Sequence, residues 1–372
     1  MEGLVTIATK ARGAPPSAGF WAGKRVLVTG HTGFKGGWLA FWLHSLGTKV
    51  AGYSRPPNTA PSFFETCGLE SMLSWHTVGD VCDSQALQGF VKQVQPHIVF
   101  HLAAQPLVRL SYQDPVDTYQ TNVLGTVQLL EAVRQTQSVE AVVVVTSDKC
   151  YENKEWLWGY RESDPLGGHD PYSSSKGCQE LVAASYRKSF FNDHGPALAT
   201  ARAGNVIGGG DWSADRLLPD AMRAYFSKSP LTIRYPKATR PWQHVLEPLN
   251  GYLILAEQLC SQPALAGSYN FGPLDSDVRT VEEVLDLVSK ALPSPLTWGL
   301  EPNSQPHEAN LLKLDCSKSM TLLDWKPRWG LEKAVSASCD WYSKASKNAD
   351  MAEICESNLE QFVTSNETSE NS

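Results

Sequence analysis

The chain has 372 residues, of which 42% are hydrophobic and 19% charged, which is typical of a globular protein with two domains or with one large domain and an added lobe. Its formal net charge of −7 argues against non-specific nucleic-acid binding and against a polybasic membrane anchor, and no apolar run approaches the length of a membrane span. The eight cysteines are scattered without the spacing of zinc ligands, so we expect no metal site and reduced thiols in a cytoplasmic protein.

The first informative stretch is a glycine-rich turn. Residues 24–29 form a buried apolar run, a glycine stands at every third position from Gly30 to Gly36, and a helical pattern follows. Glycines allow a tight turn and close approach of the backbone, and the helix N-terminus then faces a pyrophosphate. The spacing differs from Gly-x-Gly-x-x-Gly and is also compatible with a structural turn, but the flanking strand and helix favour a dinucleotide site. We assign to this site Gly30, Gly33, Phe34, Lys35 and Gly36.

Three further strands, over 50–53, 75–79 and 97–102, should complete the dinucleotide site. NAD-binding proteins usually have an acid for the ribose after the second strand, whereas this chain has Ser54 and Arg55. Both side chains could accept a 2′-phosphate, so the residues leave the choice between NAD and NADP open. The residues that follow the three strands and should contact the cofactor are Ser54, Arg55, Asp80, Val81, Ala103, Ala104 and Gln105.

A helix is expected over 114–134, and a structural role is expected for the Asn122 within it. Residues 141–146 are the most β-branched run of the chain and should form the central strand. Open parallel sheets place their chemistry beyond the carboxyl ends of the strands, where Ser147, Asp148 and Lys149 follow. A solvated loop is the alternative, but this position favours a catalytic set.

A second catalytic pair is expected on a helix that begins near Asp170. Tyr172 and Lys176 are one turn apart and share a face of that helix. An ammonium beside a phenol favours the phenolate and lowers the pKa of the phenol, so the pair can take a proton from an alcohol. An ordinary amphipathic helix would show the same spacing, and the upstream dinucleotide pattern is what favours catalysis.

The alternation of strand and helix breaks after a sixth strand. Residues 205–240 and 273–345 contain stretches rich in proline and tryptophan and are expected to form a smaller substrate-binding lobe. Residues 20–204, with returning segments over about 241–272, are expected to form the dinucleotide-binding domain.

The two ends of the chain are expected to lie outside both parts. Residues 1–19 lack the apolar core of a secretory signal and are expected to be a flexible extension, although an organellar address stays open. Residues 346–372 are polar towards their end and are expected to be a disordered tail.

Four ordered stretches, residues 29–36, 146–151, 202–212 and 240–245, are too long for chance agreement. Together they resemble the CDP-glucose 4,6-dehydratases, a branch of the extended short-chain dehydrogenase/reductase superfamily. The resemblance covers about residues 20–345 and implies an α/β fold, with a Rossmann-type doubly wound parallel sheet and a smaller C-terminal substrate-binding lobe. It also implies a lyase that recycles NAD, converts CDP-D-glucose to CDP-4-dehydro-6-deoxy-D-glucose and water, and supplies deoxysugar synthesis for surface polysaccharide.

The resemblance also implies residue roles. Tyr172, with Lys176, would take the proton of the sugar 4-hydroxyl, and Ser147 would hydrogen-bond the same oxygen. Lys149 would remove the proton at C5, or would stay charged and stabilise an enolate, and Asp148 would protonate the departing 6-hydroxyl. Lys149 stands where most sugar dehydratases have Glu, which is a feature of the CDP-glucose branch. The matching motifs further place His31 near the pyrophosphate and assign Asn205, Arg240 and, less directly, Arg234 to the substrate.

Three alternatives share parts of this pattern. A nucleotide-sugar 4-epimerase would have the same Tyr–Lys pair but needs no acid for the 6-hydroxyl, so Asp148 distinguishes it from a dehydratase. A dehydratase of another nucleotide sugar, or a non-catalytic nucleotide-binding regulator, would also share the scaffold. Relatives in the superfamily suggest a homodimer or a larger homo-oligomer.

Overall fold

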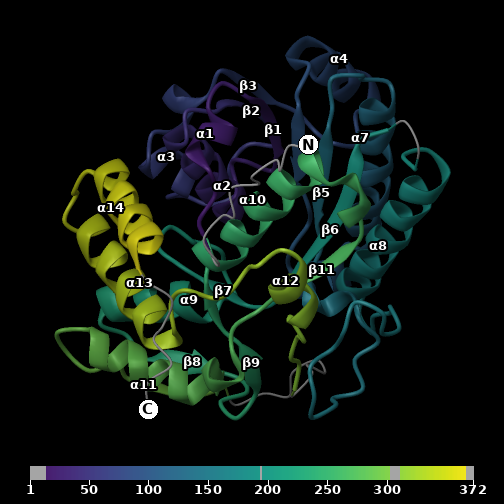
Figure 1. Ribbon diagram of the computed structural model, residues 1–372. Helices are drawn as coiled ribbons and strands as arrows, with labels where there is room; N and C mark the ends of the chain where they lie inside the picture. The colour runs from purple at the N-terminus through teal and green to yellow at the C-terminus, as the bar shows by residue number, and fades with distance from the viewer. Residues whose placement is uncertain (1–13, 193–194, 302–310, 366–372) are drawn as a thin grey trace, which may run out of the picture.

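The computed structural model describes residues 14–192, 195–301 and 311–365. At its centre is a seven-stranded parallel sheet (Figure 1). The strands follow in the spatial order β3 (Trp75–Val78), β2 (Lys49–Ser54), β1 (Arg25–Thr29), β4 (Ile98–His101), β5 (Ala141–Val145), β6 (Ala197–Ala203) and β11 (Ser268–Phe271). Each expected strand is present to within two residues, and the Rossmann-type doubly wound sheet predicted from the sequence is confirmed.

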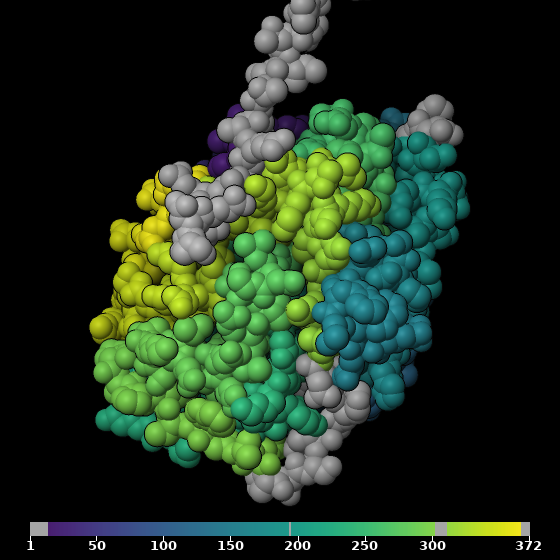
Figure 2. Space-filling view, turned by 60° about the horizontal axis from the view of Figure 1, so that its bottom comes forward, coloured from purple at the N-terminus to yellow at the C-terminus, as the bar shows by residue number. Residues whose placement is uncertain are grey.

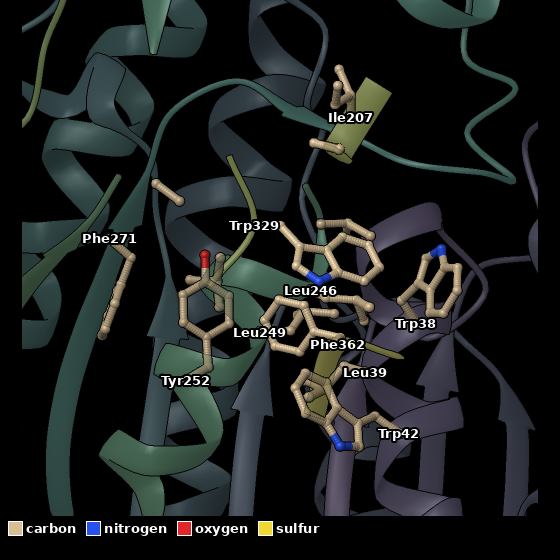
Figure 3. Packing of buried hydrophobic residues seen from close by; sticks show 14 of the residues in the cluster. Trp38, Leu39, Trp42, Ile207, Leu246, Leu249, Tyr252, Phe271, Trp329 and Phe362 are labelled. Atoms are coloured by element: carbon tan, nitrogen blue, oxygen red, sulfur yellow. The ribbon is translucent and has the colours of Figure 1, made fainter. Parts of the chain in front are cut away.

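The sheet is buried on both faces because helices cover each side, which is why its strands are continuous apolar runs. On one face pack α4 (Ser84–Val94), α7 (Gly125–Arg134) and α8 (Pro171–Ser189), and on the other α2 (Phe34–Ser45) and α10 (Leu246–Ser261). Figure 3 shows the second face, where Trp38 and Trp42 of α2 belong to the same cluster as Leu246 and Leu249 of α10. The described residues contain no helix with the length and apolar character that a membrane crossing requires.

The helix expected over 114–134 is built from three consecutive pieces. α6 (Pro115–Tyr119) is followed by a π-helical turn, η2 (Gln120–Leu124), and then by α7. Asn122 lies in the π-helical turn, fully buried, and its amide bonds both backbone groups of Gln105 as well as the Ser175 hydroxyl. The structural role expected for Asn122 is therefore confirmed.

A second group of elements lies beyond the carboxyl ends of the sheet, at the bottom of Figure 1. It contains the parallel pair β8 (Leu231–Ile233) and β13 (Trp298–Leu300) and the antiparallel pair β9 (Thr239–Pro241) and β12 (Val278–Thr280). The helices packed with these strands are α9 (Leu217–Ser227) and α11 (Val281–Ala291), and α13 (Leu331–Ala345) packs on α11. A short pair, β7 (Val206–Ile207) and β10 (Gln243–His244), connects the two parts.

The loop between β5 and α8 closes one side of this group. Figure 2 shows the blue segment of residues 151–168 against the yellow-green segment that begins at residue 311. The backbone of Tyr160 bonds Lys313 and Asp315, at 2.9 Å in each case. The remaining short elements are α1 (Ala18–Trp21), α3 (Phe63–Thr66), η1 (Leu69–Met72), α5 (Val108–Gln113), η3 (Asp148–Cys150), η4 (Pro263–Leu265), η5 (Asp275–Asp277) and α12 (Ser317–Leu322).

The structure describes part of each chain end, and in both parts it shows a helix where the sequence predicted disorder or flexibility. The tail predicted to be disordered over 346–372 contains a helix, α14 (Met351–Thr364), whose N-cap Asp350 accepts bonds from two backbone N–H groups. α14 is ordered because Met351, Cys355, Leu359 and Phe362 recur at helical spacing and are buried. The extension predicted to be flexible over 1–19 ends in α1, and residues 1–13 and 366–372 lie outside the described residues.

Candidate active site

A cavity of about 1160 Å³ opens at the carboxyl ends of the parallel strands and extends between the sheet and the second group of elements. This volume is large enough for a dinucleotide and a second small molecule together. Every site residue predicted from the sequence except His31 lines it. These residues are Gly30, Gly33, Phe34, Lys35, Gly36, Ser54, Arg55, Asp80, Val81, Ala103, Ala104, Gln105, Ser147, Asp148, Lys149, Tyr172, Lys176, Asn205, Arg234 and Arg240.

The glycine turn provides a close backbone cradle at one end of the cavity. Gly30 has a φ of +77°, and a Cβ there would stand 2.7 Å from the Ala103 nitrogen. A Cβ at Gly36 would stand 2.1 Å from the Gly30 oxygen, so the turn tolerates no side chain at either position. α2 begins after Gly33 with neither a side-chain cap nor an acid in its first turn, which leaves its first N–H groups to an anion.

His31 does not face the cavity, and its predicted position near a pyrophosphate is wrong. The imidazole is fully buried, 5.0 Å from the His76 ring and 5.5 Å from the Phe64 ring. It fills the space over Gly52, where a Cβ would meet the ring at 2.5 Å. Burial lowers the pKa of His31 to about 3, so this side chain is a neutral part of the core.

At the opposite edge of the turn, Arg55 is held between two carboxylates. Its guanidinium lies 2.7 Å from Asp80 and 3.0 Å from Asp117, while the Ser54 hydroxyl bonds that of Thr32 at 2.8 Å. The two carboxylates neutralise Arg55, the cation that the sequence analysis considered as a ligand of a 2′-phosphate. This end of the cavity therefore carries a net negative charge.

The end of β5 presents an acid with one free oxygen. The Ser147 hydroxyl donates to Oδ1 of Asp148 at 2.9 Å, whereas Oδ2 is buried and finds no hydrogen-bond partner among the described residues. Burial raises the pKa of Asp148, against the opposing effects of Lys149, the Ser147 bond and the Arg240 charge. A carboxyl group in this environment keeps its proton to a higher pH than an exposed one and is suited to act as an acid.

α8 places Tyr172 and Lys176 at the same end of the cavity. As predicted, Asp170 caps this helix by accepting the Ser173 N–H at 2.9 Å. Burial raises the pKa of Tyr172 to about 12, although contact with the Ser147 hydroxyl and the charge of Arg216 lower it. The ammonium of Lys176 donates to the Val145 carbonyl at 3.3 Å, and no hydrogen bond to Tyr172 is found among the described residues. The phenolate expected from the Tyr–Lys spacing is thus absent from the protein by itself, because burial outweighs the nearby charges.

Two of the predicted substrate residues are cations in different surroundings. Arg234 lies 3.5 Å from Asp215, a carboxylate that Arg109 also contacts at 3.2 Å. Arg240, on β9, is buried and donates to its neighbour's carbonyl, and its charge reaches Asp148. Arg240 is therefore the cation of the pair that lies closer to the catalytic end of the cavity.

The sequence interpretation missed Arg216. This side chain lines the cavity, lies 3.6 Å from Asp211, and its charge lowers the pKa values of Tyr172 and Lys35. The sequence did contain a signal for Arg216. This residue lies on the glycine-rich loop that follows β6 and Asn205, and that loop starts from the carboxyl edge of the sheet.

Comparison with known proteins identifies the family of the chain. The family model of GDP-mannose 4,6-dehydratase matches residues 27–258. The chain belongs to this dehydratase family. A curated relative, the CDP-glucose 4,6-dehydratase of Salmonella typhimurium, is 51% identical over 342 residues, which cover 90% of this chain and 95% of the relative.

Several solved structures share the fold at much lower identity. UDP-glucose 4-epimerase from Thermus thermophilus, solved in complex with NAD, has a TM-score of 0.75 at 24% identity and covers 86% of this chain and 99% of its own. dTDP-glucose 4,6-dehydratase from Bacillus anthracis, also solved with NAD, has a TM-score of 0.71 at 20% identity, over 88% and 98%. These similarities establish the fold.

Proposed function

We propose that the protein is an NAD-dependent CDP-glucose 4,6-dehydratase, a hydro-lyase that converts CDP-D-glucose to CDP-4-dehydro-6-deoxy-D-glucose and water. The observation that carries this proposal is the 51% identity, over 95% of its length, to a relative with that name. The site supports a dehydratase over an epimerase, because it adds a buried, proton-retaining Asp148 to the Tyr–Lys pair.

The glycine cradle, the small residues after β4 and the acids around Arg55 fit NAD. The free N–H groups of α2 suit the pyrophosphate, and the absence of a Cβ at Gly30 and Gly36 permits its close approach. A 2′-phosphate would meet the carboxylates of Asp80 and Asp117, which favours NAD over NADP. Bound NAD supplies the redox chemistry and one further positive charge.

Different side chains of the protein then carry out the separate proton transfers. Tyr172 takes the proton of the 4-hydroxyl, and Ser147 and Arg216 stabilise the charge on the tyrosine oxygen. Lys149 acts at C5, either as the base or as a charge that stabilises the enolate, and Asp148 gives its proton to the 6-hydroxyl as that group leaves as water. The ketone at C4 is what acidifies the C5 proton, so the oxidation must come first.

The activity is tested by incubating the purified protein with CDP-, dTDP-, GDP- and UDP-hexoses and following loss of water by mass spectrometry. We expect CDP-glucose to give a 4-keto product that absorbs in alkali, with no net NADH. Steady accumulation of NADH would indicate a simple dehydrogenase, and a C4 epimer with no loss of water would indicate an epimerase. Binding of CDP-glucose and NAD without turnover would indicate a regulator.

Arg240→Ala is expected to raise the KM for CDP-glucose about tenfold to a hundredfold, because a charged hydrogen bond to the substrate diphosphate would be lost. Arg279→Ala is the matched control, since Arg279 stands opposite Arg240 in the β9–β12 ladder but does not line the cavity. Steady-state kinetics at several CDP-glucose concentrations measures both. An unchanged KM in Arg240→Ala would refute the contact.

We also propose that two copies associate through an apolar face on α6, η2 and α8. Val116, Leu124 and Leu181 are all more than half exposed there, and Leu124 and Val116 line one shallow hollow. Leu124→Asp should convert a dimer to a monomer in light scattering, while Leu300→Asp, at a comparably exposed leucine on β13, should not. A wild-type monomer, or a dimer that tolerates Leu124→Asp, would contradict this interface.

A cytoplasmic location is proposed on the state of the thiols. All eight cysteines are free, and Cys67 and Cys355 remain thiols although their sulfur atoms lie 3.5 Å apart. Free thiols are the state expected of a protein in a reducing compartment.

A further inference from the structure

The side chain of Lys176 is held by a residue to which no role has been assigned, Gln179. The ammonium donates to Oε1 of Gln179 at 2.9 Å and to the carbonyl of Val145 at 3.3 Å. Both acceptors are neutral oxygens, and both Lys176 and Gln179 are buried. A buried ammonium requires such acceptors, because it has lost its hydration.

The orientation of the Gln179 amide follows from its other partner. Thr126 donates its single hydroxyl proton to the Asn122 carbonyl at 2.7 Å, so it can only accept from Nε2 of Gln179, which lies 2.8 Å away. The amide oxygen must then face Lys176. His101 also bonds Thr126, which fixes the hydroxyl further.

Burial, together with the charge of Lys35, lowers the pKa of Lys176 to about 7, so its charged form depends on the groups around it. Burial lowers the pKa of His101 to about 3 and raises that of the Cys150 thiol, so both are uncharged, and Lys35 adds a second positive charge. Glu180, the nearest acid on α8, is bound to Arg202 at 2.8 Å and also accepts from Thr200. Tyr172 lies one turn earlier on α8, where the charge of Arg216 lowers its pKa and those of Asp148 and Asp170 raise it.

We propose that Gln179 is a positioning residue that holds the Lys176 ammonium through a neutral oxygen, so that its positive charge stays available to the Tyr172 oxygen. A carboxylate at this position would pair with the ammonium and add a negative charge near Tyr172. An apolar side chain would leave the ammonium with one acceptor and would disfavour its charged form. Either change makes the phenolate of Tyr172 less stable. The inference rests on the proposed function, in which Tyr172 is the base.

The test compares Gln179→Glu and Gln179→Met with the control Gln258→Glu. Gln258 lies on α10, donates to the Leu323 carbonyl and does not line the cavity. Turnover of CDP-glucose depends on two protons: it rises with pH as Tyr172 loses its proton and falls as Asp148 loses its own. We expect both Gln179 variants to move this acid limb to higher pH, by about one unit or more for Gln179→Glu, and to lower turnover at neutral pH about tenfold. The control should keep the wild-type profile.

Two results would overturn the proposal. One is lower activity in both folded Gln179 variants with the acid limb unmoved, which is what a purely structural role predicts. The other is a wild-type profile in both. Carbon-13 labelling of the tyrosine ring, with Tyr172 assigned from Tyr172→Phe, gives a readout that needs no turnover. In the NAD-loaded protein its titration midpoint should lie higher in Gln179→Glu than in the wild type. If the wild type does not act on CDP-glucose, the proposed function fails, whereas this midpoint still decides the role of Gln179.

Discussion

Tyr172→Phe is expected to lower turnover about a hundredfold to ten-thousandfold, the range for loss of a general base. The substitution removes only the hydroxyl and keeps the ring that packs at the start of α8, so the protein should remain folded. Formation of the 4-keto sugar measures the loss, and thermal unfolding and NAD content measure integrity.

The matched control for this variant is Tyr186→Phe. Tyr186 lies on the same helix, but its hydroxyl bonds Glu131 at 2.7 Å, away from the cavity. We expect this control to turn over CDP-glucose at close to the wild-type rate. A folded Tyr172→Phe protein with full activity would remove Tyr172 as the base.

Asp148→Asn is expected to lower the rate of water loss about a hundredfold or more, while oxidation at C4 continues. An amide cannot give a proton to the departing 6-hydroxyl, so a CDP-4-dehydroglucose species and NADH should build up on the protein. Because burial raises the pKa of Asp148, its acid form persists to higher pH, and wild-type dehydration should fall as pH rises through that pKa. Dehydration at the wild-type rate in the variant would contradict the assignment.

Solvent deuterium at C5 separates the acid from the group that acts on C5. Exchange at C5 should continue in Asp148→Asn and stop in Lys149→Met, if Lys149 is the base. Exchange at the wild-type rate in Lys149→Met would leave Lys149 an electrostatic role. Comparing Asp148→Asn with Lys149→Met also shows whether proton removal at C5 precedes loss of water.

Local sequence predicted most of the fold because its signals do not depend on distant contacts. The strand β5 was identified from a β-branched run, and its position made Ser147, Asp148 and Lys149 candidates before any contact was known. The Tyr172–Lys176 spacing placed both residues at the cavity, but it did not indicate that burial raises the pKa of Tyr172 or that Lys176 turns to Val145.

The remaining features depend on tertiary packing. His31 was misplaced because its direction depends on the empty space over Gly52, a residue of another strand. Gln179 is three residues from Lys176 on α8, but the orientation of its amide comes from a contact with Thr126 on a neighbouring helix, which the local sequence does not show. The helix α14 had a usable pattern of buried residues, but the polar composition of the tail outweighed it.

The parallel sheet and the helix α2 that covers it are completed by residues far along the chain. β11 is the neighbour of β6, and Phe362 of α14 packs on Trp42 of α2 with ring centroids 5.7 Å apart (Figure 3). While the chain leaves the ribosome, the edge of β6 therefore stays unpaired until residue 271 has emerged, and Trp42 stays uncovered until residue 362 has emerged. Chains that stop short of α14 would expose the indole of Trp42 on α2, so we expect premature termination to cause aggregation as well as loss of activity.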